Sequence, residues 1–448
     1  MMDQMDVYNH LPLYLQNMVC SLEGRRIQRK RYSKEFHIFL SDYRNRNEWS
    51  YDQLCEYRDE RLRRMVKHCY ESVEYYNKIF NESGVHYKNI KRLDDLKKIP
   101  ILDKETVLQN YEQFIAKNIS RRQMVTAHTS GTTGSGFVFY TLENALRKQW
   151  AVWWRYRMNL GITLDSYCAF FGGRSVVPVK QKKAPFSRIN MPCKQEYFST
   201  YHISDRNIEW YVQELNRKQY PWIHGYPSAI SLIADYILEK GRKLDYQVRF
   251  VTTGAENLLQ PQKEKIRRAF GVYPYNHYGM SEGVANFSEN LSKQMKVDED
   301  FAAVEFCRIP DTGETEVVGT SLNNFAMPLL RYRTKDIATC METKEGRIIK
   351  SIDGRKEDYI QLKDGRKIGR LDHIFKDMVH VKEAQIYQKN NNEIDIRIIK
   401  GKGYREEDER KLMKEASLRM ADVRLRIVYV DKIARSEGGK LRFVISDI

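Results

Sequence analysis

An alternation of short apolar runs and helix signals between residues 200 and 285 constrains the fold more than any other feature. Residues 222–223 and 248–252 are apolar runs of strand length. Pro227 stands where the first turn of a helix accepts proline, and Pro261 opens a further helix in the same way, which Gly271 closes. Such alternation is typical of βαβ units, so we expect a largely parallel sheet.

The segments before and after this alternation have other patterns. Residues 1–100 are charged and helical in character, and residues 61–80 carry apolar side chains at helical spacing, which predicts one helix there. Residues 300–340 contain short strand candidates separated by glycine and aspartate turns, which predicts a small β subdomain. We therefore assign residues 1–353 to an N-terminal domain whose first hundred residues are a helical leader region.

A smaller domain is predicted after residue 353. An alternating apolar strand at 393–400 is followed by a helix from about 406 to 420 and by a second strand at 423–430. This β-α-β unit occupies roughly 95 residues, the size of a small separate domain. We expect residues 354–448 to form it.

The formal net charge of +17 indicates a partner or substrate that carries negative charge. Part of the excess lies at Arg25-Arg26 and at residues 29–31. A basic run of this kind fits a nucleic-acid surface, a membrane surface or simply a solvated helix face. No zinc-finger, RRM or KH pattern accompanies it, which argues against nucleic acid, and a polyphosphate substrate would also be attracted by the charge.

The sequence contains neither a membrane-span pattern nor a signal-peptide pattern. No apolar stretch approaches the ~18 residues of a membrane span, and acids stand at the N-terminus where a signal peptide is basic. The seven cysteines are scattered without Cys-x-x-Cys spacing, as expected for free thiols in a reducing compartment. We expect a cytoplasmic protein with no structural zinc.

Residues 129–136 read Thr-Ser-Gly-Thr-Thr-Gly-Ser-Gly and precede an apolar strand candidate at 137–141. A loop of this composition offers backbone N–H groups and hydroxyls to an anion, and no bulky side chain blocks the approach. Taken alone, the loop is equally consistent with a surface turn.

Four further clusters carry groups suited to nucleotide chemistry. Tyr278 offers an aromatic face on which a purine can stack, and Glu282 offers a carboxylate for Mg²⁺. Asp336 could accept hydrogen bonds from both ribose hydroxyls. Residues 354–358 stand at the domain boundary, where a hinge is expected, and Lys440 lies in a glycine-rich loop that suits a mobile cation. Taken alone, the Asp336 cluster is equally consistent with a salt-bridged strand end, and each of the other three is more typical of a surface or solvated turn.

The order and spacing of these clusters are more specific than any one of them. The chain resembles the adenylate-forming (acyl-CoA synthetase) superfamily, and within it the phenylacetate–CoA ligase-like branch, which includes coenzyme F-390 synthetase-like and CapK-like proteins. The resemblance extends over about residues 60–445. It rests on TSGTTGSG (129–136), HGYPSAI (224–230), TTGAE (252–256), YGMSEG (278–283), RYRTKD (331–336), GRKED (354–358) and GGK (438–440).

The resemblance implies an ATP-dependent, AMP-forming carboxylate ligase that works in two steps. ATP and a small carboxylic acid give an acyl-adenylate and pyrophosphate, and a thiol then takes the acyl group. The implied cofactors are ATP and Mg²⁺, with CoA or a phosphopantetheine carrier as acceptor. The implied fold is α/β: a large N-terminal domain of stacked mixed sheets with helices and a small β subdomain, and a small mobile α+β C-terminal domain.

The resemblance also implies roles for single residues. Glu282 and Lys440 would be catalytic: Glu282 would hold Mg²⁺, and Lys440 would bridge the acid's carboxylate and the α-phosphate. The C-terminal domain would then swing about Glu357, with Asp358 as the alternative hinge, so that Lys440 leaves before the thiol approaches. The implied nucleotide-binding residues are Ser130, Gly131, Thr132, Thr133, Gly134, Gly254, Ala255, Glu256, Tyr278, Gly279, Ser281, Asp336 and Arg355.

The pocket for the acid is less defined by the sequence. Either histidine in its region is more typical of a satisfied structural residue than of a substrate ligand, and Arg174 could pair with a second anionic group on the substrate. The expected lining is Arg174, Tyr201, His202, His224, Gly225 and Tyr226.

The chain departs from the family pattern at two places. Ser135-Gly136 replace a Lys-Pro pair that many relatives carry, and Lys335 stands where a glycine usually precedes the ribose-binding aspartate. Both departures bear on the geometry around the nucleotide, and neither removes a residue assigned to the chemistry.

Two other functions stay open at this point. The acyl group could pass to an acyl-carrier protein, or to an amine such as an amino sugar in surface-polysaccharide biosynthesis. The chain could also be an inactive nucleotide-binding relative, although Glu282, Asp336 and Lys440 together argue against this. The sequence leaves open the acid and the oligomeric state, for which a homodimer is one option.

Overall fold

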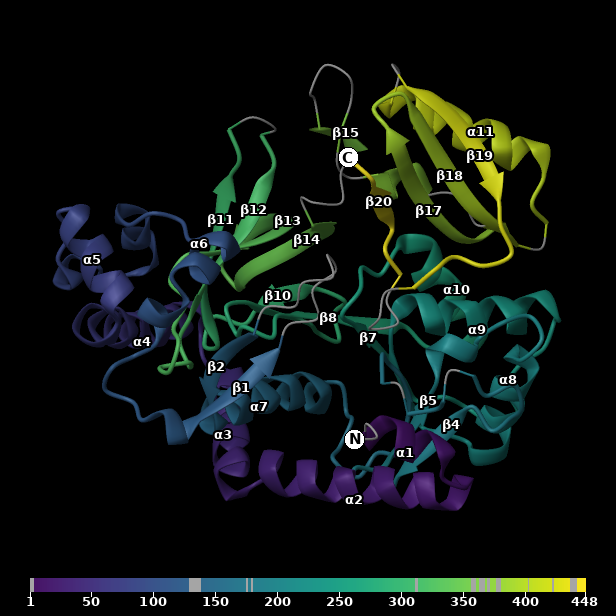
Figure 1. Cartoon of the computed structure of the whole chain (residues 1–448), viewed down its shortest axis with the longest axis horizontal. Coiled ribbons are helices and arrows are strands. Elements are labelled where there is room, and N and C mark those ends of the chain that lie inside the picture. The colour runs from purple at the N-terminus through teal and green to yellow at the C-terminus, as the bar shows by residue number, and fades with distance from the viewer. Residues whose placement is uncertain are drawn as a thin grey trace. The chain divides into compact units, whose positions relative to one another are not determined.

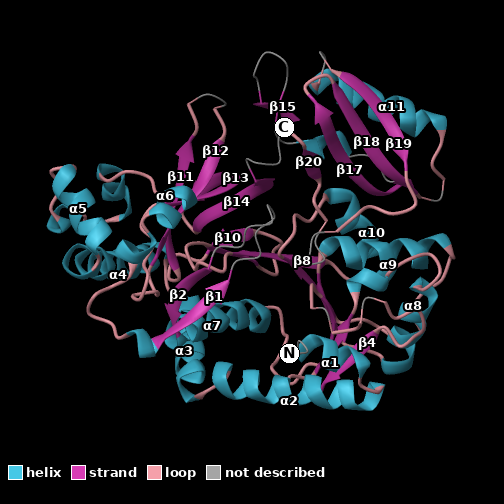
Figure 2. Ribbon diagram, in the orientation of Figure 1, coloured by secondary structure: helices cyan, strands magenta, loops and turns pink. Residues whose placement is uncertain are grey.

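The computed structural model describes residues 4–128, 138–174, 176–178, 180–310, 313–355, 360–361, 367–368, 371–375, 380–401, 403–420, 423–435 and 441–448. The chain divides into two compact units. Unit 1 contains residues 1–28, 162–276 and 356–448, and unit 2 contains residues 29–161 and 277–355. Each unit contains hydrophobic cores of its own. Figures 1 and 2 show the helices and strands of the chain.

The body of unit 1 confirms the predicted βαβ alternation. Four neighbouring strands run parallel in the order β7-β6-β3-β5, and β4 is antiparallel to β5. Pro227 is the first residue of α9, and Gly271 ends α10 with a φ of 74°, as the sequence predicted. The elements are β3 (Cys168–Phe171), β4 (Ser187–Asn190), β5 (Gln195–Phe198), α8 (Ile208–Lys218), β6 (Trp222–Gly225), α9 (Pro227–Glu239), β7 (Phe250–Gly254) and α10 (Gln260–Phe270).

The C-terminal segment of unit 1 has a separate small sheet. Its strand order is β19-β18-β17-β20, and α11 links the parallel neighbours β18 and β19, which confirms the predicted β-α-β unit. Ile386, Ile394 and Leu412 are completely buried in its core. The elements are β17 (Val381–Asn390), β18 (Glu393–Lys400), α11 (Glu406–Arg419), β19 (Arg424–Tyr429) and β20 (Val444–Ser446). The domain boundary at 353/354 stays a prediction.

Two N-terminal helices also belong to unit 1. They are α1 (Gln4–His10) and α2 (Leu13–Arg31), of which the last three residues lie past the unit boundary. Ser21 Oγ of α2 donates a hydrogen bond to the backbone oxygen of Ile189 in β4 at 3.1 Å. None of the helices in the described part of the chain is long and apolar enough to cross a membrane.

Unit 2 is built on an antiparallel sheet. Its strands follow the order β11-β12-β13-β14-β10-β9-β8, and the strands predicted over 300–340 lie at one end of it. A separate hairpin precedes α7. The strands are β1 (Met124–His128), β2 (Val138–Leu142), β8 (Pro274–Gly279, entering from unit 1), β9 (Asn286–Glu289), β10 (Met295–Val297), β11 (Ala302–Arg308), β12 (Thr315–Ser321), β13 (Tyr332–Thr343) and β14 (Gly346–Arg355).

In unit 2, the expectation of one helix over residues 61–80 was wrong. The single helix expected over 61–80 is two helices, because Val73 is extended (φ −119°, ψ 112°) and separates them. The four apolar positions Met65, Cys69, Val73 and Tyr76 are nevertheless buried, so the predicted packing face is correct. The helices are α3 (Lys34–Asn45), α4 (Tyr51–Ser72), α5 (Glu74–Glu82), α6 (Lys104–Gln109) and α7 (Glu143–Asn159).

Candidate active site

In unit 2 the structure brings together two of the sequence motifs. Tyr278 in β8 donates a hydrogen bond from its hydroxyl to Asp336 Oδ2 in β13 at 2.5 Å, and 58 residues separate the two. One ring face of Tyr278 stacks on Phe287, with ring centroids 4.7 Å apart. Asp336 is only 9% exposed. An aromatic ring and a nearly buried carboxylate are therefore held as one pair.

The backbone at Lys335 explains one departure from the family pattern. Lys335 has a φ of 65°, in the left-handed region that favours glycine. Its N–H donates to Glu316 Oε1 at 3.0 Å, and the next N–H, of Asp336, donates to Thr334 Oγ1 at 3.0 Å. The site therefore requires the left-handed conformation that a glycine would adopt without strain, and here a lysine adopts it.

Arg355 lies opposite Asp336 on the neighbouring strand. It is the last residue of β14 and the register partner of Asp336 in β13. The antiparallel pairing thus joins the motif at 331–336 to the beginning of the motif at 354–358.

The turn after β8 carries three more of the predicted residues. Gly279 lies against Trp153 and His277, where an added Cβ would approach within 2.9 Å of the His277 ring. Gln149 of α7 donates to the backbone oxygen of Met280 at 2.6 Å and so holds the turn on the helix. Ser281 and Glu282 follow, and Glu282 is 8% exposed.

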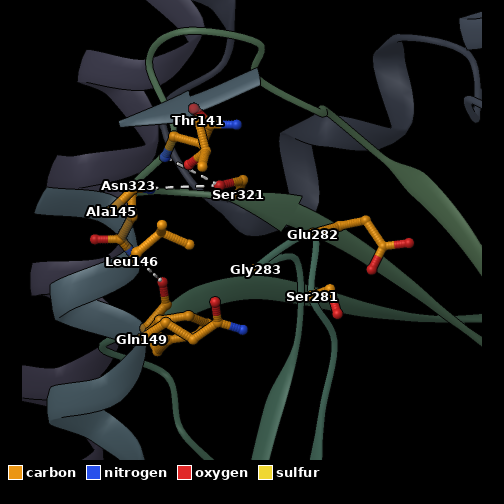
Figure 3. Close-up of a pocket in the computed structure, with 11 residues that line it drawn as sticks. Thr141, Ala145, Leu146, Gln149, Ser281, Glu282, Gly283, Ser321 and Asn323 are labelled. Carbon is orange, nitrogen blue, oxygen red and sulfur yellow. Dashed lines mark hydrogen bonds between the residues drawn. The ribbon is translucent and has the colours of Figure 1, made fainter. Parts of the chain in front are cut away.

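A small hollow with room for about one water molecule, partly open to solvent, lies beside this turn. Figure 3 shows the Glu282 carboxylate on one side of it, directed away from Thr141 and Asn323. Asn324 is fixed there by donating to the backbone oxygens of Tyr140 and Met327 at 2.9 and 3.0 Å. The lining residues are Thr141, Ala145, Leu146, Gln149, Ser281, Glu282, Gly283, Phe301, Ser321, Asn323 and Asn324.

The Glu282 carboxylate fits a magnesium ion that also binds phosphate. Mg²⁺ in nucleotide enzymes is held by one or two carboxylates and by phosphate oxygens. Glu282 supplies one nearly buried carboxylate, and among the described residues that line the hollow the other polar groups are hydroxyls and amides, without a lysine or arginine. Within the described residues, no group of three or more histidine, cysteine or acidic side chains could hold a metal by itself.

In unit 1, the predicted residues Gly254, Ala255 and Glu256 form the end of β7 and the turn after it. Ala255 has a φ of 65°, which an alanine adopts only at a cost. Glu256 accepts hydrogen bonds from the backbone N–H of Ser228 at 3.2 Å and from that of Leu441 at 2.9 Å. Burial raises the pKa of the Glu256 carboxyl, although Ser228 and Arg435 act in the opposite direction.

The C-terminal segment contacts the body of unit 1 through several charged side chains. Arg435 donates to Ser228 Oγ at 2.9 Å and pairs with Glu383. Lys265 of α10 donates to the backbone oxygen of Val381 at 2.7 Å and also pairs with Asp235 at 2.9 Å. Arg435 opens the 435–440 stretch, but its role could not be predicted from the sequence, because its partners lie on distant segments.

The residues expected to line the acid pocket all lie in unit 1. Both histidines have structural contacts: His202 Nδ1 is 2.7 Å from Ser199 Oγ, and His224 Nδ1 is 2.9 Å from Thr252 Oγ1. Arg174 is exposed and lies over the ring of Tyr197.

Three more expected pocket residues lie nearby in the chain. Tyr201 is in a 3₁₀ turn at Thr200–His202, and Gly225 lies so close to Phe171 that a Cβ would clash with its backbone oxygen. Burial raises the pKa of Tyr226 to about 12. None of these contacts identifies the carboxylic acid that would bind, so the pocket stays a prediction.

Several predicted residues lie outside the described part of the chain. They are Ser130, Gly131, Thr132, Thr133 and Gly134 of the glycine-rich loop, the departure at Ser135-Gly136, the hinge candidates Glu357 and Asp358, and Lys440. Their roles rest on the resemblance alone.

Comparison with known protein families and sequences gives relatives over the whole chain. Residues 360–447 match the CapK C-terminal domain family. Protein CapK of Staphylococcus aureus is 26% identical over 99% of both chains. Phenylacetate-coenzyme A ligase of Aromatoleum evansii is 28% identical over 70% of this chain and 73% of its own.

Solved structures show which fold this is. A 2-hydroxyisobutyryl-CoA ligase in the postadenylation state has a TM-score of 0.66 at 17% identity, over 87% of this chain and 89% of its own. An acyl acid amido synthetase has a TM-score of 0.56 at 12% identity, over 84% of this chain and 87% of its own. The chain therefore has the α/β fold of adenylate-forming ligases, as predicted.

Proposed function

We propose that this chain, a homologue of CapK and of the phenylacetate–CoA ligases, activates a carboxylic acid with ATP and transfers the acyl group to a thiol, most naturally that of CoA. The observation that carries the proposal is the Tyr278–Asp336 hydrogen bond in unit 2, in the same unit as the nearly buried Glu282. A base-stacking ring, a ribose-binding carboxylate and a magnesium-binding carboxylate together suit a nucleotide.

In the first step, a carboxylate oxygen of the acid attacks the α-phosphorus of ATP. A new oxygen–phosphorus bond forms, the bond to the β-phosphate oxygen breaks, and pyrophosphate leaves. Tyr278 would carry the adenine, and Asp336 would accept the ribose hydroxyls. Glu282 would hold magnesium, which would supply charge neutralisation at the phosphate oxygens, where attack by one anion on another would otherwise be opposed.

Lys440 would bridge the acid's carboxylate and the α-phosphate during this step. The structural support for that role is indirect. Leu441, the next residue, is tied to Glu256 through its backbone N–H, and Glu256 belongs to the TTGAE motif of the nucleotide site. A lysine placed between two anionic reactants lowers the barrier chiefly by position and charge.

In the second step, the thiol sulfur attacks the acyl carbonyl carbon of the adenylate and AMP leaves. Lys440 must vacate the position that the thiol takes. Rotation of the C-terminal domain, residues 354–448, about Glu357 or Asp358 would accomplish this, and the contacts of Arg435 with Ser228 and of Lys265 with Val381 would then break.

A second candidate keeps the adenylation step and changes the acceptor. The similarity to CapK covers 99% of this chain, whereas the similarity to the phenylacetate ligase covers 70%. The C-terminal segment also matches the CapK C-terminal domain family. An acceptor other than CoA, such as a carrier-protein thiol or an amine in surface-polysaccharide biosynthesis, therefore ranks next.

Pyrophosphate release from Mg-ATP tests the proposal with a panel of aryl and short polar acids, each with and without CoA. We expect release with at least one acid and formation of its thioester when CoA is present. Asp336→Asn and Glu282→Gln should lose most of this activity, and the exposed Glu345→Gln should retain it as a matched control.

The pattern of results separates the alternatives. Release without thioester formation would favour a carrier-protein or amine acceptor. If no acid of the panel elicits release and the protein still binds ATP, the chain is an inactive relative and the proposal is wrong.

A further inference from the structure

The helix α2 has one side packed on unit 1 and another side exposed (purple in Figure 1). Gln16, Cys20 and Gly24 are the buried residues, and they recur every four positions. Gly24 lies so close to Asn190 that an added Cβ would overlap its side chain at 1.9 Å. Asn17 accepts a hydrogen bond from the backbone N–H of Ile189 at 3.0 Å. These contacts fix the rotation of the helix about its own axis.

Large apolar side chains occupy the exposed side. Tyr14, Met18 and Leu22 follow one another at intervals of four residues and are 70%, 51% and 60% exposed. Among the described residues, 15 large apolar side chains are exposed, and six of them lie within Val7–Leu22. Single exposed apolar residues are ordinary, but a contiguous group marks an interaction surface.

Arginines continue the same row toward the helix C-terminus. At 100° per residue, Arg25 and Arg29 fall within the sector of about 80° that Tyr14, Met18 and Leu22 occupy. The helix contains one acid, Glu23, which pairs with Arg26. Within the described part of the chain, neither Arg25 nor Arg29 has an ion-pair partner. We call Tyr14, Met18, Leu22, Arg25 and Arg29 the α2 face.

We propose that the α2 face binds an anionic membrane surface, with the helix lying in the plane of the interface. The apolar half would enter the boundary between head groups and acyl chains, and the arginines would contact lipid phosphates. The helix is about 28 Å long, and its C-terminal third is strongly basic, so it would lie on the membrane rather than cross it.

The composition of the α2 face favours an anionic lipid surface over nucleic acid and over a second copy of the chain. Nucleic acid would satisfy the arginines but leave the row of Tyr14, Met18 and Leu22 in water. A second copy of the chain would bring together two faces that carry arginines and no carboxylate. An anionic lipid surface complements both halves of the face.

Co-sedimentation of the full chain with vesicles tests the proposal. We expect binding to vesicles of phosphatidylcholine and phosphatidylglycerol in equal parts, little binding to phosphatidylcholine alone, and weakening by salt. Arg25→Gln with Arg29→Gln should reduce binding about fivefold for each arginine removed. The triple change Tyr14→Ser, Met18→Ser, Leu22→Ser should reduce it at least as much.

A matched control uses exposed apolar residues elsewhere. Met191→Ser with Leu291→Ser removes two side chains that are 72% and 62% exposed and should leave binding unchanged. Circular dichroism and the melting temperature establish that each variant is folded.

Three results would overturn the proposal. The first is equal binding by the wild type and by folded variants of the α2 face. The second is a dimer that the triple serine variant abolishes, without vesicle binding, which would identify a second copy as the partner. The third is binding to duplex DNA, but not to vesicles, that only the arginine variant loses.

Discussion

Glu256 accepts a hydrogen bond from the backbone N–H of Leu441 at 2.9 Å, although 185 residues separate the two. Leu441 directly follows Lys440, so this contact fixes one end of the segment that presents the proposed catalytic lysine. The same carboxylate also accepts from the N–H of Ser228 at the start of α9. A residue expected to line the adenine thus also positions the C-terminal segment.

Replacing Glu256 by alanine should slow adenylation more than acyl transfer, because it removes the acceptor for the Leu441 N–H. We expect the kcat for pyrophosphate release to fall about tenfold to a hundredfold, as small misplacements of reacting groups do. Glu256→Gln keeps an acceptor oxygen and should retain most of the rate, and Glu264→Ala, at a half-buried position of α10, serves as the control. Equal loss in both half-reactions would argue that Glu256 contributes only to nucleotide binding.

Lys440→Ala should remove adenylation and spare transfer from a preformed acyl-adenylate to CoA. Loss of a positioned charge at a reacting phosphoryl group costs about a hundredfold to a thousandfold in kcat. Lys432→Ala, an exposed lysine of the same segment, should leave both half-reactions unchanged. If Lys440→Ala slows the two half-reactions equally, the assigned role of Lys440 is wrong.

The Tyr278–Asp336 pair predicts separable effects on ATP binding. Tyr278→Phe keeps the ring and removes the hydrogen bond to Asp336, so the Kd for ATP should rise by only a few fold. Tyr278→Ala also removes the stacking face, which is worth about 1–3 kcal/mol for a base and therefore about 5- to 150-fold in affinity. Titration with ATP by calorimetry measures both, and equal effects of the two variants would exclude stacking.

Lys335→Gly should stabilise the protein by up to about 1 kcal/mol, because the left-handed conformation costs an L-residue about 1–2 kcal/mol and glycine recovers part of that. Urea unfolding measures the change. The exposed Lys350 lies in β14 and is not in the left-handed region, so Lys350→Gly should destabilise by about 0.5–1 kcal/mol. Destabilisation by Lys335→Gly would mean that the contact of Lys335 with Glu105 outweighs the strain.

His277 predicts a pH dependence of stability. Its ring packs against Trp153 and Tyr156, and burial lowers its pKa to about 3 from 6.5. Between these two values the unfolded chain binds a proton that the native chain does not, so stability falls as the pH decreases through this range. The slope contributed is at most about 1.4 kcal/mol per pH unit.

His277→Gln removes that titration and should flatten the dependence in urea unfolding between pH 4.5 and pH 7. His37→Gln, at an exposed position of α3, provides the control and should keep the wild-type slope. An unchanged slope in His277→Gln would mean that other groups dominate the acid destabilisation.

The elements best predicted from the sequence are those with local signals. Pro227 and Gly271 mark helix ends by chemistry that acts within one turn, and the apolar alternation at 393–400 matches β18. The seven motifs indicated the superfamily because their order along the chain can be read from the sequence without a structure.

The break at Val73 could not be predicted in this way. On the far side of the break, Tyr76 donates to the backbone oxygen of Pro328 at 3.2 Å, and its hydroxyl accepts from the N–H of Leu330 at 2.7 Å. These partners are more than 250 residues away, so tertiary contacts set the direction of α5 and the local periodicity does not record it. The same reason applies to Arg435 and to the pairing of Tyr278 with Asp336.

The contact between Ser21 of α2 and Ile189 of β4 has a consequence for synthesis of the chain, since 168 residues separate them. At about 5–20 residues per second, the ribosome needs roughly ten to thirty seconds to make that interval. During this time the side of α2 with Cys20 and Gly24 has no native surface to cover it. Helix α2 must therefore wait for its binding surface, and any factor that shields nascent apolar segments would act on it during that interval.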